Sequence, residues 1–353
     1  MDAADSLEER LRRVGLALGL DAVGFAPATP SERTRFLRDW VARGYSGEMH
    51  YIARRLEQRV DPRKVLESAR SIVVVALACP EVPSGVPRDA GVGRIARFAG
   101  GDDYHDVLLD RVRALEAALP VMAGTAVRSR SYVDTGPVAE RAAAERAGLG
   151  WIAKNSCLIH PELGSHLMLG VILTDLTLAS DERVADHCGT CRACLEACPS
   201  DAFPEPHVLD ARRCIAYTTV ELRGSIPDSL RRAQGDHVFG CDVCQNVCPW
   251  NRSRPRAPLA DPLGLRSRLT SRQEWLAPTL EWILSLSPEA FGEATRKSAL
   301  RRAGHRGLMR NALVAAGNAR SVELRSLVMA FVEGDDELLR EHAHWALAQI
   351  DAD

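Results

Sequence analysis

The sequence lacks the segments that would place it in a membrane or outside the cell. Its longest apolar run covers residues 72–79, far short of the roughly 20 residues that span a bilayer. The N-terminus carries Asp2, Asp5 and Glu8, and no apolar leader follows, so we expect no secretory signal. The sequence therefore predicts a cytoplasmic protein with no membrane partner.

Aromatic residues and net charge are also scarce. Only 5% of the 353 residues are aromatic, which predicts an aliphatic core. The formal charge of −2 excludes a general attraction to nucleic acid, so such a partner needs a local basic patch. Neither a dinucleotide-binding glycine fingerprint nor a phosphate-binding P-loop occurs, so nothing supports nicotinamide or ATP binding.

Cysteine, in contrast, is abundant and concentrated. Eight of the ten cysteines lie between Cys188 and Cys248, whereas Cys79 and Cys157 stand apart. Disulfides are disfavoured in a reducing compartment, and clustered thiols there indicate metal chemistry. Cys79 and Cys157 are predicted to be structural.

Two motifs define the kind of metal site. Residues 188–199 read CGTCRACLEACP, and residues 241–249 read CDVCQNVCP. The first is the C-x2-C-x2-C-x3-C-P run of two-cluster ferredoxins, in which the fourth cysteine ligates the other cluster. The second motif lacks its first cysteine, because Val238 stands there, and Cys214 is left over to replace it.

This arithmetic predicts two [4Fe-4S] clusters. The expected ligand sets are Cys188, Cys191, Cys194 and Cys248 for one cluster, and Cys198, Cys214, Cys241 and Cys244 for the other. A pair of zinc sites is the alternative, since C-x2-C is also a zinc spacing. Zinc ribbons, however, need neither the cysteine triplet nor the following Cys-Pro.

The remaining pattern predicts three domains, at 1–180, 181–260 and 261–353. Strands are expected at 21–27, 71–79, 126–133 and 167–176. Helices alternate with them, including one at 103–119 that Pro120 should end, which predicts an α/β or α+β first domain. Cys- and Pro-rich turns organise the second domain. A Pro- and Arg-rich linker at 252–272 leads into helices, among which 308–316 and 338–350 share a weak repeat.

Asp134 is the first candidate for chemistry. It follows the strand at 126–133 and precedes Pro137, where a helix is expected to begin. Ligands and reactive groups commonly lie at the carboxyl ends of strands in α/β folds. Capping of the helix is an equally open interpretation, because Asp is a favoured N-cap. His105 follows Asp103 as in an Asp-x-His cobalamin motif, but the motif's glycine is absent, so His105 is predicted to be a helix-start residue.

Charge and glycine pattern add two further candidates. Eight Lys or Arg residues and one acid, Glu323, lie between Arg296 and Arg325. A solvated helical face is one interpretation, and a patch for a phosphate backbone, with Arg301, Arg302 and Arg306 on it, is the other. The Gly- and Asn-containing loop at 148–160 is typical of loops that contact ligands.

At this point the sequence resembles the epoxyqueuosine reductases, bacterial enzymes of tRNA modification. The resemblance rests on VDTGPVAERAAAERAGLGWIAKNSCLIHPELGS at 133–165, on both cysteine motifs, on RVDPRK at 59–64 and on RGLMRNALVAAGN at 306–318. It covers essentially the whole chain. Cys157 is a departure from the residue expected in many relatives.

The resemblance implies a fold and a reaction. The fold is a cobalamin-binding domain like that of reductive dehalogenases, a ferredoxin-like domain with two [4Fe-4S] clusters, and a C-terminal HEAT-like domain that helps to hold tRNA. The reaction is the two-electron conversion of epoxyqueuosine to queuosine in the tRNA anticodon loop. Asp134 would be the general acid, a role that requires a raised pKa. The implied cobalamin contacts are Arg59, Asp134, Leu158, Leu169, Ala216, Asp242 and Val243.

Two other classes of function stay open on the sequence. A corrinoid reductase for a small molecule, such as an organohalide, would have no affinity for tRNA. An electron-transfer or nucleic-acid-binding module with structural clusters would bind no cobalamin. For the reductase we expect a monomer that takes electrons from an external low-potential donor.

Overall fold

A four-stranded sheet forms the centre of the N-terminal half of the computed structural model, which describes residues 5–83, 85–87, 89–252 and 259–352. The strand order is β1-β2-β7-β4, and every neighbouring pair is antiparallel. The strands are β1 (Ala22–Pro27), β2 (Ser71–Ala78), β7 (Leu167–Thr174) and β4 (Ser129–Tyr132). The domain is therefore α+β, and the α/β alternative is wrong because the central sheet has no parallel pair.

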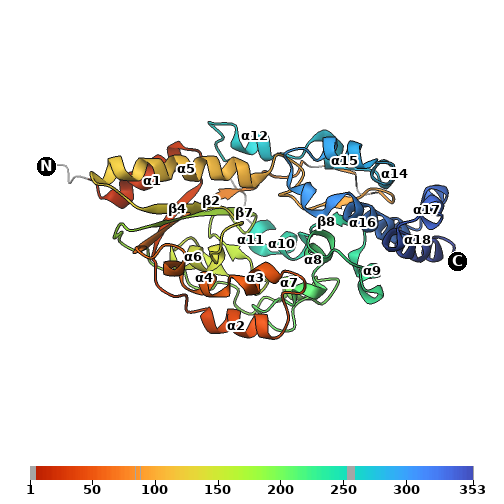
Figure 1. The fold of residues 1–353 in the computed structure, drawn as a ribbon, viewed down its shortest axis with the longest axis horizontal. Coiled ribbons are helices and arrows are strands. Elements are labelled where there is room, and N and C mark those ends of the chain that lie inside the picture. Colours follow the sequence, from red (N-terminus) through yellow and green to blue (C-terminus); the bar gives the residue numbers. More distant parts are fainter. Residues whose placement is uncertain (1–4, 84, 88, 253–258, 353) are drawn as a thin grey trace.

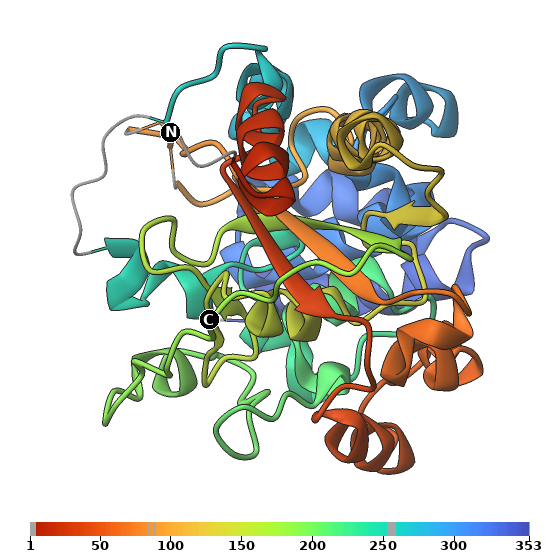
Figure 2. The same cartoon turned by 90° about the vertical axis from the view of Figure 1, so that its left-hand side faces the viewer.

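Helices cover both faces of this sheet. Helices α1 (Leu7–Ala17) and α5 (Tyr104–Ala123) pack on one face, and α6 (Glu140–Arg146) packs on the other. Alternate residues of β2 point to opposite faces, so Val73 and Val75 join the core under α5 while Val74 joins the core under α6. Burial on both faces explains why β2 is an unbroken apolar run. Figure 2 shows α1 and α5 on one side of the sheet and the green cysteine-rich segment on the other.

Helix α5 passes through Pro120, which was expected to end it. A proline lacks the N–H that would bond to residue 116, but this costs one hydrogen bond close to the end of a long helix. The helix stops at Gly124, whose left-handed backbone (φ 67°) provides the usual glycine stop.

Smaller elements surround the sheet. They comprise α2 (Thr34–Ala42), α3 (His50–Arg54), α4 (Leu56–Val60), η1 (Pro62–Lys64), β3 (Arg94–Ile95), β5 (Trp151–Ile152) and β6 (Leu158–Ile159). The cysteine-rich segment then adds α7 (Ala193–Glu196), η2 (Ala211–Arg213), α8 (Ile215–Val220), α9 (Asp228–Gln234), β8 (His237–Phe239), α10 (Val243–Asn246) and α11 (Pro249–Arg252). Helices α7 and α10 are single turns inside the two cysteine motifs and contact each other.

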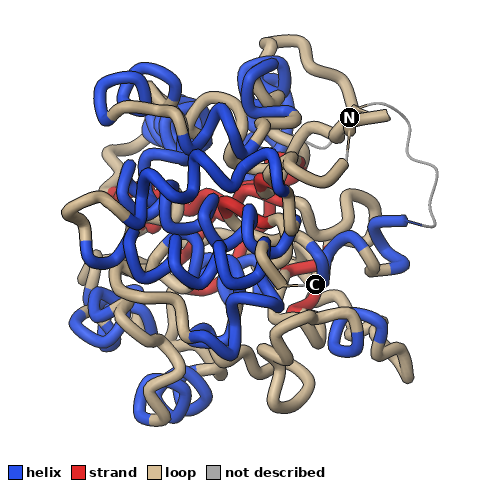
Figure 3. Tube along the Cα trace, turned by 90° about the vertical axis from the view of Figure 1, so that its right-hand side faces the viewer, coloured by secondary structure: helices blue, strands red, loops and turns tan. Residues whose placement is uncertain are grey.

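The C-terminal part is helical, as predicted. Its elements are α12 (Leu265–Leu269), α13 (Gln273–Leu276), α14 (Leu280–Leu284), α15 (Pro288–Ala294), η3 (Ala299–Ala303), α16 (Gly304–Ala319), η4 (Val322–Leu324), α17 (Arg325–Val332) and α18 (Glu337–Ile350). Helix α16 packs against α18 and against β8. Figure 1 places α16, α17 and α18 at the opposite end of the molecule from α1, and Figure 3 shows the helices of this end in front of the strands.

The segment at 252–272, which was expected to be a linker, contains a packed helix, α12. Residues 253–258 lie outside the described residues, but α12 packs on α5, and Leu265 and Leu269 join the core of the sheet. Arg266 forms an ion pair with Asp21. These contacts fix α12 to the first domain. No helix among the described residues combines the length and apolar character needed to cross a membrane.

Candidate active site and cluster segment

Asp134 lies in a strained loop directly after β4. Its φ of 55° is in the left-handed region, which non-glycine residues adopt uncommonly and often at functional sites. Helix α6 begins only at Glu140, and its N-cap residue is Ala139. The capping interpretation of Asp134 is therefore wrong, because the chain runs five residues further before the helix starts.

Three residues at the start of α5 hold the Asp134 carboxylate. The Tyr104 hydroxyl donates to Oδ2 of Asp134 at 2.7 Å, and Nε2 of His105 lies 3.3 Å from the same oxygen. Nδ1 of His105 lies 2.6 Å from Oδ1 of Asp103, which also caps α5. His105 is a helix-start residue, as predicted, and it also bridges two carboxylates that are 31 residues apart in the sequence.

These contacts place the proton on histidine. The surrounding protein disfavours a charged Asp134, but hydrogen bonds from His105 and Tyr104 outweigh this effect and lower its pKa to about 2. Burial disfavours a charged His105, but its bonds to Asp103 and Asp134 raise its pKa to about 9. The expected raised pKa of Asp134 is therefore wrong for this arrangement. At neutral pH the structure pairs an imidazolium with a carboxylate.

A second acidic residue, Glu140, lies close to Asp134. Burial, and then the negative charge of Asp134, raise the pKa of Glu140 to about 8. Its Oε1 atom is buried with no hydrogen-bond partner, and so is Nε of Arg59. Glu140 was not predicted as a site residue, because it lies in the helix expected after Pro137. The available signal was its position six residues after Asp134.

The two unpartnered atoms bear on the cobalamin expectation. Buried polar groups are almost always hydrogen-bonded, so an unsatisfied donor on Arg59 and an unsatisfied acceptor on Glu140 fit a ligand with polar side chains. Arg59 also donates from Nη1 to the carbonyl of Val138 at 3.2 Å. This places its guanidinium beside the Asp134 loop.

The other residues expected to contact cobalamin lie on four different elements. Leu158 (β6) is buried in the α6-side core, and Leu169 (β7) packs against that core. Ala216 lies in the first turn of α8, two residues after Cys214. Asp242 and Val243 begin α10 between two predicted cluster cysteines. Burial raises the pKa of Asp242, and its carboxylate accepts a 2.7 Å hydrogen bond from the backbone of Arg97.

The structure brings together cysteines from within each predicted ligand quartet. Burial, followed by the charges of Cys188, Cys248 and Cys191, raises the pKa of Cys194 to about 11. Burial and neighbouring charges that include Cys214 and Cys198 raise the pKa of Cys241 to about 12. A hydrogen bond to Cys157 and burial raise the pKa of Cys244, and the charges of Cys214 and Cys241 raise it further. Thiols that raise one another's pKa in this way would be deprotonated by a bound metal.

Cys157 lies against the second quartet. Its sulfur is hydrogen-bonded to that of Cys244, and this bond lowers the pKa of Cys157. Asn155 reinforces the contact, because its side chain bonds to the Cys244 carbonyl at 3.3 Å and to the Cys157 amide at 3.2 Å. The loop at 148–160 therefore contacts the cluster segment. Cys79 is buried at the end of β2, as expected.

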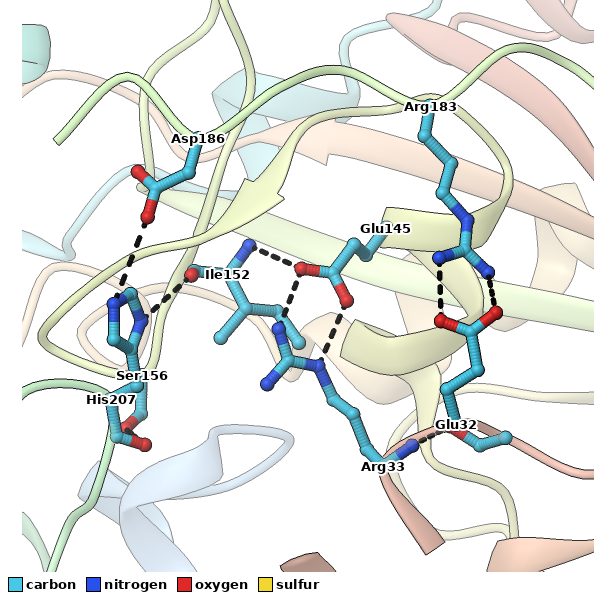
Figure 4. Close-up of polar contacts among 9 residues, drawn as sticks. Glu32, Arg33, Glu145, Ile152, Ser156, Arg183, Asp186 and His207 are labelled. Carbon is cyan, nitrogen blue, oxygen red and sulfur yellow. Dashed lines mark hydrogen bonds and ion pairs between the residues drawn. The ribbon is translucent and has the colours of Figure 1, made fainter. Parts of the chain in front are cut away.

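Polar contacts fasten the cluster segment to the first domain (Figure 4). Glu145 of α6 accepts two bonds from Arg33 and one from the backbone of Ile152. Arg183 forms a two-bond pair with Glu32 at 2.7 Å. His207 bonds to the carbonyl of Ile152. The Arg183 and His207 bonds hold the segment against the start of α2 and against β5. The Glu145 bonds, within the first domain, join these two places to α6, the helix that follows Asp134.

The arginines of the tail have different roles. Arg302 pairs with Glu221, Arg306 pairs with Asp336, and Arg301 is exposed. Arg310 is fully buried and donates to the carbonyls of Thr218, Leu222 and Gly224. Arg310 therefore belongs to the core. The expected basic patch accordingly contains fewer than the eight Lys and Arg residues counted between Arg296 and Arg325.

Comparisons with known proteins agree with this architecture. The family model "4Fe-4S double cluster binding domain" matches residues 187–251, and the model "Epoxyqueuosine reductase QueG, DUF1730" matches residues 59–135. The fold and site thus define an iron–sulfur protein with a double-cluster domain attached to an α+β domain.

Relatives along the whole chain identify the family. An epoxyqueuosine reductase of Escherichia coli (strain K12) is 36% identical over 348 residues, which cover 98% of this chain and 90% of the relative. One from Synechocystis sp. is 40% identical over 296 residues, covering 82% of this chain and 98% of the relative. The chain belongs to the epoxyqueuosine reductase family.

Solved structures of epoxyqueuosine reductases are similar to this chain over nearly its whole length. An epoxyqueuosine reductase structure with an epoxyqueuosine-modified tRNA-Tyr stem loop aligns with a TM-score of 0.89 at 32% identity, covering 98% of this chain and 90% of that one. The Bacillus subtilis reductase, with its catalytic aspartate loop swung out of the active site, aligns with a TM-score of 0.88 at 32% identity, covering 98% and 91%.

Proposed function

We propose that this protein reduces epoxyqueuosine to queuosine in the anticodon loop of tRNA. The observation that carries the proposal is the alignment of 98% of the chain with the reductase structure that holds an epoxyqueuosine-modified stem loop. The substrate is accordingly a tRNA, and the protein is an oxidoreductase. The small-molecule reductase and the electron-transfer module lack such support.

Two [4Fe-4S] clusters would supply the electrons one at a time. The proposed ligand sets are Cys188, Cys191, Cys194 and Cys248, and Cys198, Cys214, Cys241 and Cys244. The effects of these thiols on one another's pKa support this assignment. The C-x2-C-x2-C-x3-C-P run favours cubanes, in which each thiolate binds a different iron, over zinc. The match of residues 187–251 to the model "4Fe-4S double cluster binding domain" supports the same choice.

Cobalamin is the proposed cofactor between the clusters and the substrate. When bound, it supplies a strongly reducing centre at the epoxide. Arg59 and Glu140 have unpartnered buried atoms available for its polar side chains. Leu158, Leu169, Ala216, Asp242 and Val243 are the further proposed contacts, some of them through backbone atoms.

The reaction takes up two electrons and two protons. Both bonds from carbon to the epoxide oxygen break, the oxygen leaves as water, and a carbon–carbon double bond forms. Negative charge develops on the oxygen as the first bond breaks. His105 holds the proton at neutral pH and lies 3.3 Å from the Asp134 carboxylate, so His105 passes its proton to Asp134, which relays it to the epoxide oxygen. Tyr104 orients the carboxylate through its 2.7 Å bond.

The second proton has a source nearby. Glu140, with a pKa of about 8, is mostly protonated at neutral pH. Asp134 is 64% exposed and can therefore reach a substrate that enters from outside. A general acid in such a position typically accelerates a reaction by about 10²–10⁴-fold.

The remaining parts of the proposal concern the whole chain. Residues 1–180 would bind cobalamin, 181–260 the clusters, and 261–353 would form a HEAT-like domain that holds tRNA, with Arg301, Arg302 and Arg306 on the phosphates. The protein would be a cytoplasmic monomer that receives electrons from a low-potential donor.

The test uses anaerobically reconstituted protein with cobalamin, a chemical reductant and epoxyqueuosine-modified tRNA. Nucleoside mass spectrometry should show conversion to queuosine, and omission of cobalamin should abolish it. Reduction of an organohalide together with an unchanged tRNA would overturn the proposal. Conversion without cobalamin would overturn the cofactor assignment alone.

A further inference from the structure

We propose that Tyr51 is a stacking platform for an anticodon-loop base next to the modified nucleotide, and that Arg302 binds the phosphate beside that base. The inference rests on the proposed function and assigns a tRNA contact to the first domain. The partner is thus an unpaired nucleotide with its phosphate, at the mouth of the Asp134 site.

Two guanidinium groups lie near the Tyr51 ring. Tyr51 belongs to the short helix α3, and it is 38% exposed although few large apolar side chains of this protein reach the surface. Cζ of Arg302 lies 5.8 Å from the ring centroid and Cζ of Arg59 lies 6.0 Å from it. These distances are within the range of cation–π attraction. The arginines therefore help to hold the ring in place.

The two arginines connect Tyr51 to different parts of the site. Arg59 bonds to the carbonyl of Val138 at 3.2 Å, four residues after Asp134. Arg302 lies in η3 of the C-terminal part and pairs with Glu221. Tyr51 therefore stands where α3, the Asp134 loop and the tail meet.

The electrostatics agree with this position. Burial raises the pKa of the Tyr51 hydroxyl, and the charges of Glu221 and Asp134 raise it further. The hydrogen bond to Glu221 raises the pKa of Arg302, and the charge of Asp134 adds to this effect. Both side chains are thus close enough to Asp134 to sense its charge.

Arg302 has donors to spare for a phosphate. Its bonds to Glu221 use Nε at 3.1 Å and Nη2 at 2.8 Å, and nothing among the described residues accepts from Nη1. The side chain is 52% exposed. Glu221 therefore fixes the guanidinium plane while one edge stays accessible.

An unpaired nucleotide offers the chemistry that this surface recognises. Proteins bind single-stranded nucleic acid by stacking bases on aromatic rings and pairing phosphates with cations. A base to be modified must leave the stack of its neighbours, so a neighbouring base gains from a new stacking partner. An exposed tyrosine beside a half-exposed arginine supplies both interactions.

The test is binding of an epoxyqueuosine-modified anticodon stem loop to the full-length, cluster- and cobalamin-loaded protein, measured by anisotropy over a range of salt concentrations. Tyr51→Ala should weaken binding by about 5- to 100-fold, as loss of one base stack does, with the parental salt slope. Arg302→Ala should lower the log–log slope by about 0.7–0.9, because one phosphate contact is lost. Tyr51→Phe should bind like the parent.

The chain supplies a matched control in Tyr45. Two arginines also lie near its ring, with Cζ of Arg43 at 5.9 Å and Cζ of Arg212 at 5.4 Å from the ring centroid. These arginines pair with Glu205 and Asp210, on the cluster segment. Tyr45→Ala should therefore leave both affinity and salt slope unchanged.

The remaining outcomes separate this inference from the proposed function. Parental affinity in Tyr51→Ala would overturn the stacking role, while the reductase assignment would stand if that protein still makes queuosine. Loss of the cobalamin absorption spectrum in Tyr51→Ala would place Tyr51 in the cofactor pocket and also overturn the inference. A parent that neither binds nor reduces the stem loop would overturn the proposed function itself. Equal iron content and circular dichroism confirm that the variants are folded.

Discussion

At the scale of single residues, the acidic centre depends on a histidine that links two carboxylates. Asp103 and Asp134 each contact one nitrogen of His105, so the ring is held in one orientation and kept protonated. An aspartate alone would give up its proton far below neutral pH. The imidazolium of His105 is therefore the group that holds a transferable proton in neutral solution, and the Asp134 carboxylate is its route to the substrate.

Replacing Asp134 tests the last step of this proton transfer. Asp134→Asn is nearly isosteric and still accepts from Tyr104, so the fold, both clusters and cobalamin binding should persist. Single-turnover formation of queuosine should fall by about 10²–10⁴-fold, since the acid is lost. Rapid-quench measurements on tRNA provide the rate, and iron analysis provides the control. An unchanged rate would remove Asp134 from the chemistry.

The pH profile tests the histidine. The folded-state pKa of His105 is about 9, above the ordinary 6.5, so the proton is held below that pH and lost above it. The single-turnover rate should therefore fall as the pH rises through about 9. The ion pairs of His105 should stabilise the fold fully below pH 6.5. This stabilisation should be lost as the pH rises from 6.5 through about 9.

His105→Gln provides the matching variant. It should be slower at neutral pH and should lack the loss of activity near pH 9. Thermal melting of both proteins across the pH range reports the stability difference without any cofactor chemistry. A parental pH profile in the variant would assign the titration to another group.

At the scale of elements, one glycine sets how closely two tail helices pack. A Cβ atom on Gly317 would lie 2.7 Å from the Trp345 ring and 2.8 Å from the Cα of Ala346. The second neighbour is backbone, which cannot rotate away. Helices α16 and α18 can therefore make this contact only with glycine at that position.

Gly317→Ala should destabilise the protein by about 1–3 kcal/mol, the usual cost of overpacking. Gly307 lies on the same helix, and a Cβ there would make an ordinary 3.6 Å contact with Ala303. Gly307→Ala should accordingly stabilise the helix by about 0.5–1 kcal/mol. Denaturant unfolding of both variants gives the comparison, and equal effects would contradict the packing argument.

Local sequence patterns predicted elements better than they predicted contacts. Strand β2 was found because an apolar run buried on both faces is visible in the sequence. The partners of Asp134 were not predicted, because Tyr104 and His105 reach it through tertiary packing of α5 beside β4. Arg310 was counted as surface charge for the same reason, since only the fold shows that three backbone carbonyls surround it.

At the scale of the whole molecule, the two cysteine motifs depend on each other. Each proposed cluster takes thiols from both motifs, and the second also takes Cys214, so neither site can form from one motif alone. The short helices α7 and α10 touch where the two motifs meet. The segment is thus expected to fold only as the clusters assemble.

Cys214→Ser tests the proposed ligand assignment. The parent should hold about eight iron atoms per chain, four for each cubane. The variant should lose up to about four and keep the electron paramagnetic resonance signal of the other cluster. Cys79→Ser is the control, because Cys79 is buried at the end of β2, and it should keep all the iron. The reverse result would show that the assignment is wrong.

The buried side chains of Arg310 and Asn311 limit how this protein could be divided or recombined. Together they satisfy carbonyls of Thr218, Thr219, Leu222, Gly224 and Val238, all of them upstream of the tail. A chain shortened before α16 would lose the partners of these carbonyls and expose the apolar core that α16 shares with Val238 and Phe239. The tail therefore cannot be removed without damage to the fold. Exchanging it between relatives would succeed only if the incoming tail also carried an arginine–asparagine pair at these positions.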